Sequence, residues 1–405
     1  MLLRMIKPAI IFAGFSLADY VEEAISLFPK ETYRYICVYG RIVNSDKKRA
    51  YLSLFDETYT LDTLPADLAE TIEVVTCTQE RDMDIYIALL KLTGKISEKE
   101  ANLWTKVINK RQFKETMSEV DPALVPQVAL FDTIDYPRDL IKYPAVIKPT
   151  NLMGSSFVSV IHSSDELDQY LKNISEYEYL IKKIGRQPEL VIEEFVSGPQ
   201  YSMNVYINKT GEIIYCPLAR VIPAFEIGIN DTYSAIQYNT TLPAADMDSL
   251  RQAISTIVST FSLHGTSAHF DCIFSPTGWK ICEVGLRIGG SRQELFHSSH
   301  GFSHFKNDLY NRVGKEVDLG MLKNTVAIVQ KAPYEAVSMS DLSYETTKEA
   351  GVSFHLHKLT EAPFKSVPVS QGGATVFRAF LSGENEEAVI SSAKELLASI
   401  TFKPL

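Results

Sequence analysis

The sequence contains few cysteines, and their spacing shows no disulfide framework. Five cysteines occur in 405 residues, and none lies in a Cys-x-x-Cys pair. They are Cys37, Cys77, Cys216, Cys272 and Cys282. Because the set is odd in number and scattered over the chain, it predicts reduced thiols and a cytoplasmic location.

A long apolar run and an excess of positive charge are also lacking. The longest uncharged stretch, residues 252–270, is rich in Ser, Thr and His, so we expect no membrane span. A short apolar run follows Pro8 and ends before Asp19, which favours a buried strand over a signal peptide. Lys and Arg number 40 against 50 Asp and Glu, and the net charge of −10 disfavours nucleic acid as a partner.

The composition that remains is that of a folded globular chain. Hydrophobic residues make up 45% and charged residues 22%, and the length predicts two to three domains. Strand and helix patterns alternate through the first hundred residues, and this alternation predicts an open parallel sheet with helices on its faces. We therefore expect the α/β class.

Polar side chains follow the strand pattern of residues 71–78. Gln79 and Glu80 come directly after it, and ligands on parallel sheets gather at the carboxyl ends of strands. For Glu80, a carboxylate that starts a helix is the favoured interpretation, and a substrate contact is the alternative.

Changes of pattern along the chain predict three units, at residues 1–110, 111–196 and 197–405. The middle unit has short strands around one helix, which Ser163 and Glu166 should begin as a capping box. Turn signals at residues 209–211 and 275–278 predict two hairpins in the last unit.

The second of these hairpins carries two carboxylates. Asp271 and Glu283 lie on either side of the turn, and Arg287 follows four residues after Glu283. Antiparallel partners lie about 5 Å apart, so the two carboxylates should be neighbours that need a cation between them. Magnesium is the usual cation for oxygen ligands. A salt-bridge ladder on the surface explains the same residues, and they do not decide between the two.

Two further segments place charged side chains at strand ends. Lys148 ends an apolar strand and precedes a loop that contains Gly154, Ser155 and Ser156, so its ammonium and the loop N–H groups could surround phosphate oxygens. Glu193 and Glu194 end another apolar strand, and neighbouring side chains on a strand point to opposite faces. Taken singly, each segment also fits an ordinary edge strand.

In this order, the segments resemble the ATP-grasp superfamily, in which a small lid domain and a larger carboxy-terminal domain clamp ATP. The resemblance implies that Lys110 and Lys148 bind the nucleotide, that residues 150–158 cover its phosphates and that residues 193–196 hold adenine. It implies magnesium carboxylates at Asp271 and Glu283, and a role for Arg287 at the transferred phosphoryl group. The implied nucleotide contacts are Lys110, Lys148, Gly154, Ser155, Ser156, Glu193, Glu194, Phe195, Val196 and Gln200.

The sequence departs from the superfamily pattern at three positions. Gly285 stands where an Asn usually provides a further metal ligand, Gln200 where a ribose-binding Glu is common, and Phe157 where the lid loop often has glycine. A water molecule could fill the coordination position that Gly285 leaves.

The run EVGLRIGGS resembles the carboxylate–amine ligases that include the L-amino-acid ligases. That likeness implies ATP with two magnesium ions, manganese as a substitute, amino-acid substrates and an acyl-phosphate intermediate. It implies a substrate site at Arg287, Gly290 and Ser291, to which the place of Glu80 after its strand adds that residue as a candidate. The small Ser291 leads us to expect at least one substrate with a large side chain. A small-molecule kinase, a ligase for another acid or amine, and a regulator that binds ATP without turnover stay open, as does a homodimer.

A histidine cluster gives a separate, weaker pattern. His297, His300 and His304 have the spacing of one helix face, but Gly301 interrupts that helix and no fourth ligand is evident. Zinc is therefore the disfavoured interpretation.

Overall fold

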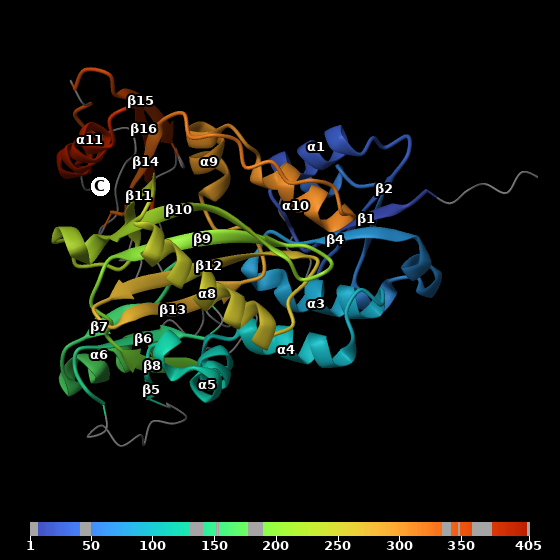
Figure 1. The fold of residues 1–405 in the computed structure, drawn as a ribbon, viewed down its shortest axis with the longest axis horizontal. Coiled ribbons are helices and arrows are strands. Elements are labelled where there is room, and N and C mark those ends of the chain that lie inside the picture. Colours follow the sequence, from blue (N-terminus) through green and yellow to red (C-terminus); the bar gives the residue numbers. More distant parts are fainter. Residues whose placement is uncertain are drawn as a thin grey trace, which may run out of the picture.

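The computed structural model describes residues 7–40, 50–129, 141–150, 152, 154–176, 189–333, 342–346, 349–358 and 375–402. Three sheets organise this part of the chain, one parallel and two antiparallel (Figure 1). The prediction of a mixed α/β fold is confirmed.

The first sheet is parallel, as the alternating patterns predict. Its strand order is β3-β2-β1-β4, with β1 at Ala9–Ala13, β2 at Arg34–Val38, β3 at Glu57–Tyr59 and β4 at Ile72–Thr76. Strand β1 is wholly buried because helices cover the sheet. These helices are α1 (Ala18–Leu27), α3 (Met83–Leu92) and α10 (His304–Val313). Helix α4 (Glu98–Ile108) packs on α3. A short 3₁₀ helix, Glu80–Asp82, begins just after β4.

The second sheet is small and antiparallel, in the order β5-β8-β6-β7. Its strands are β5 (Val128–Ala129), β6 (Ala145–Pro149), β7 (Ser159–Ile161) and β8 (Leu190–Glu194). Helix α6 (Ser164–Glu176) packs on this sheet, and α5 (Lys110–Val120) precedes it. The predicted start of α6 is confirmed, since Glu166 N donates to Ser163 Oγ over 3.2 Å.

The third sheet has eight antiparallel strands in the order β13-β12-β9-β10-β11-β14-β16-β15. They are β9 (Gln200–Ile207), β10 (Ile213–Pro223), β11 (Ser234–Thr240), β12 (Thr266–Ser275), β13 (Gly278–Gly285), β14 (Thr325–Lys331), β15 (Ser353–Lys358) and β16 (Phe377–Gly383). Both predicted hairpins are present, as β9–β10 and β12–β13. The helices are α8 (Ala244–Thr260), α9 (Arg292–His300), α10 (His304–Val313) and α11 (Glu386–Ser399).

A buried polar network joins the first sheet to the third. Asp308 on α10 accepts hydrogen bonds from Thr76 Oγ1 at the end of β4, over 2.9 Å, and from Ser267 Oγ on β12. Arg312 Nε donates to the same carboxylate over 2.9 Å, and its Nη1 reaches Val75 O over 3.1 Å. These bonds fix the end of β4 against the large sheet, and the position of Glu80 depends on that end.

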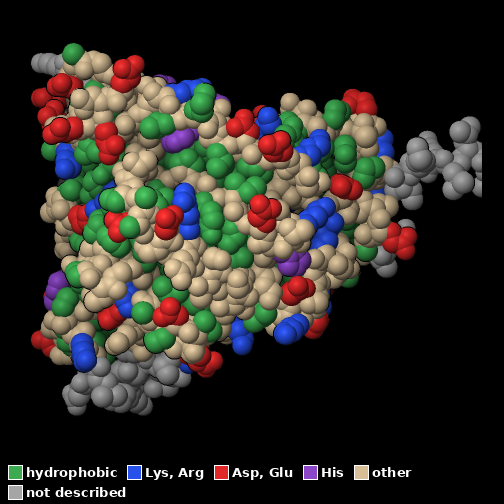
Figure 2. Space-filling model, viewed as in Figure 1, with side chains coloured by type: hydrophobic (Ala, Val, Ile, Leu, Met, Phe, Trp, Pro, Cys, Tyr) green, Lys and Arg blue, Asp and Glu red, His purple; other side chains and the backbone are tan. Residues whose placement is uncertain are grey.

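The surface charges and the helix lengths bear on possible nucleic-acid and membrane partners. Acidic and basic side chains both occur across the face shown in Figure 2. Among the described helices, none is both long and apolar enough to cross a membrane.

Candidate active site

One cavity of about 1130 Å³ lies between the small sheet and the large sheet. With one exception, every residue that the sequence assigns singly to the site lines it. These are Lys110, Lys148, Gly154, Ser155, Ser156, Glu193, Glu194, Phe195, Val196, Gln200, Asp271, Glu283, Arg287, Gly290 and Ser291. The exception is Glu80, which does not line the cavity but forms an ion pair with Arg287, a residue that does. The loop at residues 150–158 lines the cavity in part, and its positions 151 and 153 lie outside the described residues. Folding thus brings together residues that are scattered over two hundred positions of the chain.

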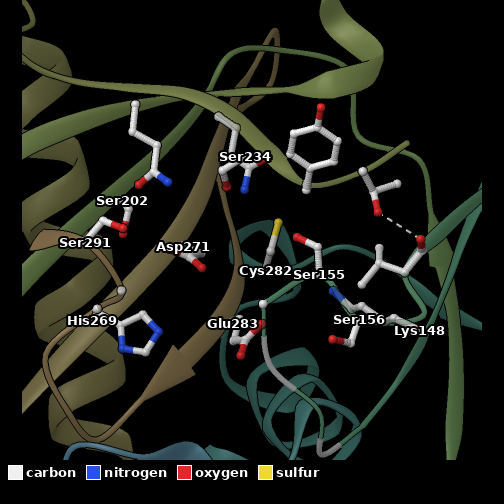
Figure 3. Close-up of a pocket in the computed structure, with 18 of the residues that line it drawn as sticks. Lys148, Ser155, Ser156, Ser202, Ser234, His269, Asp271, Cys282, Glu283 and Ser291 are labelled. Carbon is white, nitrogen blue, oxygen red and sulfur yellow. Dashed lines mark hydrogen bonds between the residues drawn. The ribbon is translucent and has the colours of Figure 1, made fainter. Parts of the chain in front are cut away.

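The two carboxylates of the hairpin are direct cross-strand partners. Asp271 on β12 and Glu283 on β13 are opposite each other in the register, and both face the cavity (Figure 3). Lys110 Nζ lies 3.0 Å from Glu283 Oε1 and also donates to Leu152 O over 2.8 Å. Burial alone would raise the pKa of Glu283, but Lys110, His269 and Lys148 lower it to about 2. Glu283 is therefore held ionised.

Lys148 belongs to a buried cluster of two lysines and one glutamate. Its Nζ lies 2.7 Å from Glu193 Oε1, and Lys114 Nζ contacts the other oxygen of the same carboxylate. Burial lowers the pKa of both lysines, and their mutual repulsion lowers that of Lys114 further. One carboxylate thus contacts two buried lysines, and of these Lys148 lines the cavity, where it can donate to an anion.

The loop after Lys148 has an unusual backbone. Ser155 and Phe157 have φ angles of 57° and 60°, the left-handed region that favours glycine. Phe157 tolerates it because its ring is buried in the core of the small sheet and its carbonyl accepts a 2.6 Å hydrogen bond from Tyr170 Oη. The loop therefore keeps a glycine-like conformation although the glycine is replaced.

The structure explains why glycine stands at position 285. A Cβ atom there would lie 2.1 Å from Cε1 and 2.8 Å from Nδ1 of His269, its partner on β12. His269 Nδ1 also makes a 3.1 Å hydrogen bond with Arg287 O, so the ring is fixed. The imidazole thus fills the space of the missing side chain. Burial and the neighbouring Arg287 lower the pKa of His269.

Arg287 connects the cavity to the first sheet. Its Nε donates to Glu80 Oε2 over 3.0 Å, and both side chains are at least nine-tenths buried. Glu80 does begin a 3₁₀ helix, as the favoured interpretation has it, but its carboxylate is used by the arginine. Next along the chain, a Cβ on Gly290 would meet nothing within 4 Å, so open space lies beside its backbone.

Apolar side chains line the cavity beside residues 193–196. Residues 193–196 line the cavity together with Val146, Val160 and Ile273. Glu194 points away from Glu193 and lies 3.9 Å from Lys280, as alternation along a strand predicts. Gln200 lines the cavity, and its carbonyl accepts a 2.8 Å hydrogen bond from Arg220 Nη1.

The sequence reasoning missed four residues of the site. The sequence spacing could have indicated two of them. Lys114 is one helical turn after Lys110, and His269 shares a strand face with Asp271. Arg292 adjoins the assigned Ser291, and Arg378 comes from a strand about ninety residues later in the chain, so nothing local indicates it.

The histidine cluster forms no metal site in the described part of the chain. Helix α9 ends at His300 and α10 starts at His304, as Gly301 predicts. His304 is buried between Tyr206 and Asn204, and burial lowers its pKa to about 3. Within the described ranges, no three His, Cys, Asp or Glu side chains gather to hold a metal ion.

Comparison with known proteins finds a family match over part of the chain. Residues 141–294 match the ATP-grasp domain family. This chain is 29% identical to D-alanine–D-alanine ligase of Petrotoga mobilis over 103 residues. The matched segment is 25% of this chain and 30% of that protein. The expected resemblance to the ATP-grasp superfamily is confirmed.

Solved structures match over nearly the whole chain. An L-amino acid ligase from Bacillus licheniformis has a TM-score of 0.75 at 15% identity, covering 99% of this chain and 100% of that one. The biotin carboxylase domain of Hydrogenobacter thermophilus 2-oxoglutarate carboxylase, solved with MgADP, ADP and bicarbonate, has a TM-score of 0.62 at 13% identity. It covers 98% of this chain and 90% of its own. At these identities the likeness establishes the fold.

Proposed function

On the premise that this chain carries an ATP-grasp domain in an ATP-grasp fold, we propose that it is an ATP- and Mg²⁺-dependent ligase that joins two amino acids. One observation carries the proposal. A single cavity holds Lys148 on one side of the carboxylate pair, and Arg287 and Gly290 line the same cavity. The chain therefore has groups for a triphosphate and, next to them, groups for an acyl substrate.

The nucleotide would occupy the side of the cavity formed by the small sheet. Val146, Val160 and Ile273 provide flat apolar surfaces for adenine beside residues 193–196. Lys148, Lys110 and the loop N–H groups near Ser155 and Ser156 then face the phosphates.

The carboxylate pair fits magnesium bound together with ATP. Magnesium in such sites takes one or two protein carboxylates, and phosphates and water complete its octahedron. Asp271 and Glu283 are such a pair, and Lys110 together with other cationic neighbours keeps Glu283 ionised. The ion would neutralise developing charge on the transferred phosphoryl group.

The reaction follows from these positions. A carboxylate oxygen of the first amino acid attacks the γ-phosphorus, the bond to the bridging oxygen breaks, and ADP leaves an acyl phosphate behind. The amine of the second amino acid attacks the acyl carbon, and the tetrahedral oxyanion collapses to an amide with release of phosphate and a proton. Arg287 and the Gly290 N–H would stabilise negative charge in both steps. Glu80 positions Arg287 through the 3.0 Å ion pair.

The names of two similar proteins support amino-acid substrates, since one is an L-amino acid ligase and the other joins two D-alanines. The five free thiols suit a reducing compartment, and we propose the cytoplasm. A homodimer and the number of magnesium ions stay predictions.

The test is a substrate panel. The protein is incubated with ATP, Mg²⁺ and pairs of amino acids, and phosphate, ADP and new amide masses are measured. Arg287→Lys keeps the positive charge but loses the planar guanidinium that donates two hydrogen bonds at once, so turnover should fall about a hundredfold or more. Arg251→Lys on α8, an exposed arginine paired with Asp248, is the control and should keep normal turnover.

The outcomes separate the candidate functions. Amide formation with one ADP and one phosphate per bond supports the ligase. A phosphorylated acceptor that is stable without an amine would favour a kinase, and ATP binding without turnover would favour a regulator. Normal turnover in Arg287→Lys would remove the arginine from the mechanism.

A further inference from the structure

Two arginines line the cavity near Ser291 and have no part in the proposed chemistry. Arg292 is the first residue of α9 and is 4% exposed, and Arg378 reaches in from β16. Arg378 Nη2 donates to Ser291 Oγ, and its Nη1 lies 3.3 Å from Glu294 Oε1. Ser291 has a small side chain, and the guanidinium of Arg378 occupies part of the space beside it.

The protein balances only part of this positive charge. Glu294 is the acidic side chain that pairs with Arg378, and 45% of that glutamate side chain is exposed. Arg292 Nη1 donates instead to the neutral Gln237. Among the described residues, neither Arg292 Nε nor Arg378 Nε has a hydrogen-bond partner. Within the described part of the chain, Arg378 therefore contacts one half-exposed carboxylate, and Arg292 contacts none directly. The acidic charges that act on Arg292 are those of Asp271 and Glu294, and Asp271 is a carboxylate proposed to hold magnesium.

The surroundings add to this preference for an anion. Helix α9 begins at Arg292, so the positive end of its dipole lies at the same place. Gln237, Gln330 and Thr375 line the cavity nearby with neutral polar groups. Buried charge without a counterion is costly, so a bound anion would stabilise this corner.

The corner is distinct from the phosphate side. Figure 3 shows Ser291 and Lys148 on opposite sides of the pocket, with Asp271 and Glu283 between them. Because Arg378 is bonded to Ser291, its guanidinium lies on the side away from the loop of Ser155 and Ser156. Two guanidinium groups with one carboxylate in direct contact suit a second carboxylate, because guanidinium binds carboxylate in two-point geometry.

We propose that Arg378 and Arg292 form a specificity subsite for a second carboxylate, so that one of the two joined amino acids is aspartate or glutamate. This inference rests on the proposed ligase function and names its substrate class. The side chain of that amino acid extends past Ser291 towards the two guanidinium groups, while its reacting group stays beside Arg287.

The experiment compares acids with their neutral amides. Values of kcat/KM are measured for glutamate against glutamine and aspartate against asparagine, each with a panel of second amino acids. Replacing the carboxylate by an amide should cost about tenfold to a hundredfold, the usual loss for a charge-assisted hydrogen bond. Arg378→Gln should remove most of this preference, and Arg378→Lys should keep part of it. Arg34→Gln in the first sheet, where Arg34 pairs with Glu57, is the control and should leave the preference unchanged.

A binding measurement reads the subsite without turnover. Calorimetric titration of glutamate and glutamine into the protein with Mg²⁺ and a non-hydrolysable ATP analogue should show tighter binding of glutamate, lost in Arg378→Gln. Ligation of neutral pairs, with no preference for acids and no effect of Arg378→Gln on binding, would overturn the subsite and leave the ligase in place. No amide with any pair would instead refute the ligase, and glutamate binding that depends on Arg378 would still support the subsite.

Discussion

The close contact between Gly285 and His269 gives a quantitative test of the site. An alanine at position 285 would place its Cβ 2.1 Å from His269 Cε1, whereas ordinary contact begins near 3.4 Å. The ring would have to move by more than 1 Å while its Nδ1 is bonded to Arg287 O. Overpacking of this kind costs about 1–3 kcal/mol, so Gly285→Ala should destabilise the protein by that amount.

A double-mutant cycle isolates this contact. His269→Ala removes a buried ring and should itself cost about 2 kcal/mol or more. In that background the two contacts with the ring are gone, and the contact that remains is Glu80 Oε2 at 3.0 Å from the Cβ. The second substitution should therefore cost about 1 kcal/mol less than it does beside the imidazole. The two residues should therefore couple by about 1 kcal/mol or more.

The cycle is measured by urea unfolding, followed through Trp279 fluorescence. This tryptophan is buried on β13, the strand that carries Gly285. If Gly285→Ala lowers the free energy of unfolding by the same amount with and without the imidazole, within about 0.5 kcal/mol, His269 does not fill the space of the missing side chain.

Three further predictions concern stability. Glu193→Gln leaves two buried ammonium groups without a counterion and should lower the free energy of unfolding by about 3–5 kcal/mol, whereas Asp248→Asn at an exposed pair should cost less than about 1 kcal/mol. Equal effects in urea unfolding would contradict the buried cluster. Phe157→Gly should lower the free energy of unfolding by about 1 kcal/mol less than Phe157→Ala does, because only glycine is relaxed at a φ of 60°. A larger loss for glycine than for alanine would contradict backbone strain at this position. The pKa of His304 is about 3 in the folded protein and about 6.5 when unfolded, so the unfolded chain binds more protons between these values. Lowering the pH from 7 to 5 should therefore cost about 2 kcal/mol of unfolding free energy through His304, and His304→Asn should reduce the total loss by that amount. A loss of unchanged size in the variant would exclude His304 as a source.

Much of the site could be predicted because it depends on local geometry. The turn at residues 275–278 fixes the hairpin, and the hairpin fixes Asp271 opposite Glu283. The strand end at Lys148 and the alternation of Glu193 and Glu194 follow from the period of a strand. In each case, a short stretch of sequence decides both the element and the direction of the side chain.

The remaining contacts depend on how distant elements meet. The ion pair between Glu80 and Arg287 needs the first sheet to dock on the third, which the buried network around Asp308 achieves. Arg378 reaches Ser291 only because β16 lies beside β14 in the large sheet, and strand order is not encoded in local patterns. His269 could have been found from its shared strand face with Asp271, but its role needed the register with Gly285.

The central claim is that a substrate carboxylate attacks ATP directly. It is tested by supplying an acid substrate whose carboxylate carries ¹⁸O, together with ATP, Mg²⁺ and an amine, and by measuring the isotope in the products. An acyl phosphate predicts one ¹⁸O atom transferred to each phosphate released, in step with amide formation. Amide formation with unlabelled phosphate, or with release of AMP and pyrophosphate, would contradict the account.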